Sequence, residues 1–176
     1  MVILVDGASE YLFKLNVFEA LLRAVANFPS KRGIVLPVST SIGLILSSLV
    51  GTAQNRQAAA ALQQLIELNA PSILIATLFR QPKDIGAQGI WYCIGSMLVT
   101  YLDLEKTTED LQALSTLPRM MVQAQVFQAM RCSLRQSNSE EMLRYCSRVG
   151  IALLPKIDGI FLPHLHTISR TSIFNL

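Results

Sequence analysis

The stretch from Glu67 to Val99 constrains the fold most, because its hydrophobic pattern predicts two helices joined by a tight turn. Pro71 suits the first turn of a helix, where its missing N–H has no partner to lose. The second helix, after Asp84, carries an apolar stripe formed by Ala87, Ile90, Trp91, Ile94, Met97, Leu98 and Tyr101. Another face carries the small residues Gly86, Gly89, Cys93, Ser96 and Thr100. Because small side chains let another backbone approach closely, we predict that this helix has neighbours on more than one side.

Apolar residues at helical spacing recur along most of the chain. They predict helices over residues 11–28, 55–68 and 120–136, a short helix that Pro118 ends, and helices after the Ser137–Ser139 turn and between Pro155 and Pro163. Residues 1–176 are therefore expected to form a single all-α domain of about eight antiparallel-packed helices, with a strand only considered at residues 2–5. Their wide apolar faces favour a stacked helical repeat, an α-solenoid, over the alternative of a compact bundle without repeats. The same pattern would arise in a fragment of a longer protein.

Two long segments without charge, residues 33–55 and 85–102, raise the question of membrane spans. Pro37 and the Ser39–Ser41 cluster make the first half of the earlier segment poor hydrocarbon, and the later one contains glycines and Gln88. We therefore predict buried helices and no membrane span. The first residues lack the cationic lead-in of a signal peptide, so an intracellular protein, cytoplasmic or nuclear, is expected.

Composition and motifs indicate neither an enzyme nor a metal protein. The formal net charge of +3, from 15 basic and 12 acidic residues, is too small to predict nucleic-acid binding by itself. Three cysteines without CxxC spacing are typical of reduced thiols packed as small hydrophobic side chains. His164 and His166 have no carboxylate or thiolate nearby in the sequence that would complete a metal site. No phosphate-binding loop or nucleophile motif occurs, and we predict no catalysis, cofactor or metal.

A specific order of residues runs through the two predicted helices of Glu67 to Val99. It consists of Ala70, Pro71, Leu74, Leu78, Pro82, Asp84, Ile85, Gln88 and Trp91. This order resembles the armadillo repeat over about one repeat, and the resemblance implies an armadillo- or HEAT-like stack of helices. Peptide-binding armadillo proteins carry an Asn four residues after the Trp that grips an extended peptide. Gly95 occupies that position here, so peptide capture in the style of nuclear import receptors is not expected.

The preferred function is a protein–protein interaction scaffold that binds an amphipathic helix or a short linear motif of another protein in a groove. The predicted groove residues are Gln88, Trp91, Tyr92, Gly95 and Ser96 on one helix, with Gln128, Arg131 and Arg135 on the next long one. Trp91 and the arginines also have simpler interpretations. Trp91 would be a core residue, and the arginines would form a solvated face.

Nucleic-acid binding is the alternative from a different class. From Arg119 onward, seven Lys and Arg residues stand against three Asp and Glu residues. The candidate phosphate contacts are Arg119, Arg131, Arg135, Arg144 and Arg148. Two pairs of arginines spaced four apart could hold phosphates, although Glu140 and Glu141 neutralise one pair. A third interpretation is a structural segment of a larger solenoid.

Overall fold

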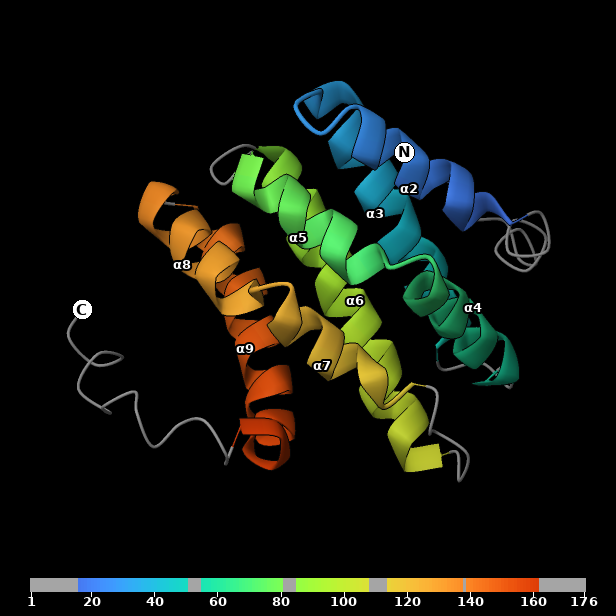
Figure 1. The fold of residues 1–176 in the computed structure, drawn as a ribbon. Coiled ribbons are helices and arrows are strands. Elements are labelled where there is room, and N and C mark those ends of the chain that lie inside the picture. The colour runs from blue at the N-terminus through green and yellow to red at the C-terminus, as the bar shows by residue number, and fades with distance from the viewer. Residues whose placement is uncertain (1–15, 51–54, 81–84, 108–113, 138, 162–176) are drawn as a thin grey trace.

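The structure is a computed structural model, and it describes residues 16–50, 55–80, 85–107, 114–137 and 139–161 (Figure 1). The helices are α2 (Val17–Asn27), α3 (Arg32–Leu49), α4 (Asn55–Glu67), α5 (Ala70–Arg80), α6 (Ile85–Thr107), α7 (Thr116–Gln123), α8 (Val126–Gln136) and α9 (Glu140–Phe161). These described residues contain eight helices and no strand, which confirms the all-α class. The strand considered at residues 2–5, the turn at 81–84 and both histidines lie outside the described residues.

The three longest helices, α3, α6 and α9, form one layer with α6 in the middle. The shorter helices form a second layer over one side of it: α2 packs on α3, α4 and α5 pack on α6, and α7 and α8 pack on α9 (Figure 1). The apolar stripe predicted on α6 is buried, including Ile90, Ile94 and Met97. The helix therefore has neighbours on several sides, as its two distinct faces predicted.

The closest approach between helices is that of α3 to α6, and it depends on glycine. A Cβ atom on Gly89 would lie 3.0 Å from the backbone carbonyl oxygen of Leu36. A Cβ atom on Gly43 would lie 2.7 Å from the ring of Tyr92. Since these positions carry no side chain, the two helices pack nearly backbone to backbone. Gly89, one of the small residues predicted to admit a close neighbour on α6, does so.

A residue with left-handed backbone geometry precedes α2, α5 and α8. These residues are Asn16 (φ 52°), Asn69 (φ 56°) and Gln125 (φ 67°). Each carbonyl oxygen accepts a hydrogen bond from the first turn of the following helix, donated by the N–H of Glu19, Ile73 and Ala129 respectively, at 3.0 to 3.2 Å. Asparagine tolerates this conformation well because its short side chain bonds locally, and the Asn69 side chain indeed accepts from Ser72 Oγ at 2.7 Å. The same local device therefore starts three helices.

Three details of the predicted helix boundaries are wrong. The single helix expected over residues 120–136 is divided into α7 and α8, because Gln125 adopts the left-handed conformation. Pro118 does not end a helix but lies in the first turn of α7, where a missing N–H costs nothing. Pro155 does not begin a new helix but lies inside α9, on its exposed side.

Two helices, α3 and α6, are long and apolar enough to cross a membrane, and the bent pair α4 and α5 would make a third span if taken as one. Folding buries 61% of the apolar stretch of α6 and 39% of the apolar stretch of α3. The hydrophobic length of α6 is therefore used mostly for packing against its neighbours.

Candidate functional site

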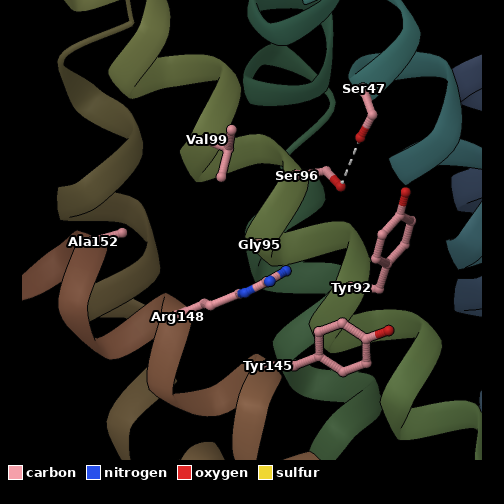
Figure 2. A pocket seen from close by; sticks show the side chains of 8 residues that line it. All are labelled: Ser47, Tyr92, Gly95, Ser96, Val99, Tyr145, Arg148 and Ala152. Carbon is pink, nitrogen blue, oxygen red and sulfur yellow. Dashed lines mark hydrogen bonds between the residues drawn. The ribbon is translucent and has the colours of Figure 1, made fainter. Parts of the chain in front are cut away.

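A pocket of about 220 Å³ opens on the layer formed by α3, α6 and α9 (Figure 2). It is lined by Ser47 of α3, by Tyr92, Gly95, Ser96 and Val99 of α6, and by Tyr145, Arg148 and Ala152 of α9. The second layer contributes none of these residues. On the opposite side of α6, Ile94 and Tyr101 are buried. The pocket is thus on the face of the long helices that the short helices do not cover.

Helical spacing brings the α6 residues to this face. Tyr92, Gly95 and Val99 recur every three or four residues, and Val99 is 50% exposed although it is apolar. A Cβ atom on Gly95 would meet nothing within 4 Å. The middle of the pocket is therefore open down to the helix backbone.

The walls of the pocket combine aromatic rings and hydroxyl groups. The rings of Tyr92 and Tyr145 meet edge to face, with centroids 6.0 Å apart and planes at 69°. Ser47 Oγ donates a hydrogen bond to Ser96 Oγ at 3.3 Å, which joins α3 to α6 beside Tyr92 (Figure 2). Two tyrosines and two serines therefore supply polar groups along an otherwise apolar surface.

Among the described residues that line the pocket, Arg148 is the one that carries a charge. Its exposed side chain points from α9 toward α6, where Gly95 lines the same pocket (Figure 2). The absence of a side chain at Gly95 leaves room for the guanidinium group and for a ligand beside it.

Within the described residues, no group of three or more His, Cys, Asp and Glu side chains is placed to hold a metal ion. No family model, curated protein or solved structure matches this chain. The function proposed below therefore rests on the chemistry of the pocket.

Of the groove residues predicted on α6, Tyr92, Gly95 and Ser96 line the pocket. Trp91 does not, and its prediction as a groove residue is corrected. It is fully buried and donates from Nε1 to Ser133 Oγ of α8 at 3.1 Å. One residue along a helix turns the side chain by about 100°, which separates the core position of Trp91 from the surface position of Tyr92.

Gln88 is half-buried and links two helices. Its Nε2 donates to Ser139 Oγ at 3.1 Å, and the same oxygen accepts from the N–H of Met142 at 3.4 Å. The beginning of α9 is thus attached to α6 by a side chain that has a structural role. The capping residue of α9 is Ser139.

The structure does not bring the predicted residues of α8 into the pocket. Gln128, Arg131 and Arg135 are exposed and lie on the side of α8 opposite Ser133, the residue that faces Trp91. They form a separate polar stripe on the second layer. A single groove shared by α6 and α8 is therefore absent among the described helices.

The arginines considered for nucleic-acid binding are spread over α7, α8 and α9. Arg119, Arg131 and Arg135 are exposed on the second layer. Arg144 forms an ion pair with Glu140, at 3.0 Å, and of these five arginines only Arg148 lines the pocket.

Sequence reasoning missed Ser47, Val99, Tyr145 and Ala152 as lining residues. Val99 had a detectable signal, because it follows Tyr92 and Gly95 at helical spacing outside the apolar stripe. The residues of α3 and α9 had none, since their proximity to α6 arises only when the three helices stack.

A second exposed apolar surface lies on α9, away from the pocket. Leu143, Ile151 and Leu154 are 55%, 72% and 60% exposed. They belong neither to the core nor to the lining of the pocket. This surface provides a useful comparison for substitutions in the pocket.

The three cysteines are free, and Cys93 and Cys146 are buried as the sequence predicted. Burial raises the pKa of each of these two thiols to about 12. Since only the thiolate reacts, native Cys93 and Cys146 should resist alkylation near pH 8, whereas the half-buried Cys132 should be modified first. Mass spectrometry after iodoacetamide treatment, with and without urea, measures the three rates. Equal rates for all three thiols in the native protein would contradict this prediction.

Proposed function

We propose that this protein is a non-enzymatic interaction scaffold with an armadillo- or HEAT-like stack of helices. In this proposal it binds a helix or a short linear motif of a partner protein at the pocket between α3, α6 and α9. The observation that carries the proposal is the pocket itself, where the apolar side chains of Val99 and Ala152 lie beside the phenol groups of Tyr92 and Tyr145 on an accessible face. Peptides are recognised by this combination of apolar contact and a few placed polar groups.

The size of the pocket supports a peptide over a cofactor. Its volume of about 220 Å³ is below the roughly 300–1,000 Å³ of pockets that enclose drug-sized ligands. The pocket accommodates one or two side chains of a longer partner segment. The remainder of that segment lies along an exposed stripe of α6. That stripe includes Ile85 and Val99 on either side of Tyr92.

The order of the helices supports a repeated architecture. The chain can be divided into α2–α3, α4–α5–α6 and α7–α8–α9, each ending in a long helix. Equivalent helices are neighbours, because α3 packs on α6 and α6 on α9, while α2 packs on α5 and α5 on α8. The left-handed residues Asn16, Asn69 and Gln125 precede the equivalent helices α2, α5 and α8. Stacked units of this kind present the faces of their last helices as one extended surface, and the pocket lies on that surface.

The test is a selection of random short peptides displayed against the immobilised protein, followed by titration calorimetry. Gly95→Leu fills the pocket, and it should leave the fold intact because a Cβ atom there meets nothing within 4 Å. Gly33→Leu on α3 is the matched control, since that position is equally open but does not line the pocket. Selected peptides should bind wild type and Gly33→Leu equally and should bind Gly95→Leu about tenfold more weakly or worse, a difference of about 1.4 kcal/mol.

A selection that enriches no peptide, or only peptides that bind all three proteins alike, would refute the proposed site. The exposed surface of α9 gives a further comparison. Val99→Asp should abolish peptide binding, whereas Ile151→Asp, at a residue that is even more exposed, should not.

We also propose that the protein acts inside the cell, in the cytoplasm or nucleus, with α6 as a core helix. Support comes from the packing of α6 against α3, α4, α5 and α9, which occupies the apolar surface that a membrane span would turn to lipid. Cell fractionation with alkaline carbonate extraction tests this localisation. The protein is expected in the carbonate supernatant, and its retention in the membrane pellet would favour membrane-spanning helices.

A further inference from the structure

The charge inside the pocket restricts which peptides fit it. Arg148 and Arg144 lie one turn apart on α9, and Arg144 is paired with Glu140. For Arg148 the part of the chain that the structure describes provides no carboxylate partner. The guanidinium group instead points from α9 toward α6, on the side of the pocket that Gly95 lines (Figure 2).

The groups around Arg148 can assist the binding of an anion. Tyr92 and Tyr145 line the same pocket and carry hydroxyl groups that can donate hydrogen bonds. Val99 and Ala152 provide apolar walls, which reduce the solvent screening of a charge that enters. None of the lining residues that the structure describes is acidic. The pocket therefore complements a negative charge next to an apolar group.

The geometry favours a carboxylate over a phosphate. A planar guanidinium group matches the two oxygens of a carboxylate with two parallel hydrogen bonds. Recognition of phosphorylated motifs generally uses a cluster of arginines, whereas the described lining of this pocket contains a single arginine. Arg131 and Arg135 cannot supplement it, because they lie on the far side of α8.

We infer that the partner segment carries an Asp or Glu whose carboxylate binds Arg148, with an adjacent apolar side chain over Gly95 between Val99 and Ala152. This inference rests on the proposed function, since it specifies the peptide that the same pocket accepts.

The peptides enriched by the selection described above provide the test. Those that lose affinity for Gly95→Leu should share an acidic residue, and replacing it with the matching amide should weaken binding about tenfold or more. Arg148→Gln should weaken the same peptides to a similar extent, and the two changes together should cost little more than either alone. Arg144→Gln is the matched control on the same helix and should leave affinity unchanged. Arg148→Glu should select peptides with Lys or Arg in place of the acidic residue.

The outcomes separate this inference from the proposed function. If pocket-dependent peptides lack an acidic residue, or bind Arg148→Gln as well as wild type, the inference is overturned while the scaffold proposal stands. If only phosphorylated peptides show the dependence on Arg148, the carboxylate is likewise excluded. If no peptide depends on the pocket, the scaffold proposal fails together with the inference. Circular dichroism of each variant verifies that the exposed substitutions leave the fold intact.

Discussion

Replacing Trp91 with alanine is expected to lower the free energy of unfolding by about 3–5 kcal/mol. Trp91 is fully buried in α6, and its indole N–H donates to the buried hydroxyl of Ser133 in α8. The substitution removes a large apolar side chain and leaves a cavity between the two layers. Because domains are stable by only about 5–15 kcal/mol, a large part of the total would be lost. Urea denaturation followed by far-ultraviolet circular dichroism measures the change, and a loss below about 1 kcal/mol would contradict the assignment of Trp91 to the core.

A double-mutant cycle can isolate the hydrogen bond within this effect. Trp91→Phe retains most of the buried ring but leaves the Ser133 hydroxyl unpaired, which costs about 1–3 kcal/mol. Ser133→Ala removes the acceptor, so adding it to Trp91→Phe should recover part of that loss. Strict additivity of the two single changes would show that the side chains do not interact.

Gly89→Leu is expected to destabilise the protein by about 3 kcal/mol, the upper end for overpacking of a core. A Cβ atom at this position would lie 3.0 Å from the carbonyl oxygen of Leu36 and 3.2 Å from Thr40 Oγ1. A backbone oxygen cannot rotate away as a side chain can, so α3 and α6 would have to separate. The decrease in the urea midpoint at unchanged slope gives the magnitude.

Two other glycines provide the comparison: Gly43, which lies in the same interface, and Gly95, which lies in the open pocket. Gly95→Ala should be neutral or stabilise the protein by up to about 1 kcal/mol, because the site is open and alanine favours the helix. Gly43→Ala should fall between the two, since its new methyl group meets the Tyr92 ring, which can shift toward the pocket. If Gly89→Leu and Gly95→Ala changed the free energy of unfolding equally, the backbones of α3 and α6 would not meet as closely as the structure shows.

Several elements could be predicted from local sequence because their causes are local. Pro71 at the start of α5 and the boundaries of α4 follow from proline geometry and apolar spacing. The division between α7 and α8 could not be predicted in this way. Gln125 has no strong preference for the left-handed conformation that it adopts. That conformation is maintained because both helices bury their apolar faces against α5 and α9.

The candidate site was predictable only on α6. Tyr92, Gly95 and Ser96 were predicted to lie together because they share one helix, where spacing defines a face, and all three line the pocket. Ser47 and Arg148 come from helices distant in the sequence, and no local pattern relates them to Tyr92. The α8 residues were wrongly grouped with the α6 face because position along the chain does not determine in which layer a helix lies.

The sequence by itself determined the all-α class, the central position of α6 and the small residues through which α3 approaches it. These follow from periodicity and side-chain size, which act within one helix. Only the tertiary structure decided that Trp91 is buried, that Tyr92 is accessible and that Arg148 lines the same pocket as Gly95. The physical reason is that the burial of each face depends on which neighbour covers it, and that depends on the packing of all the helices together.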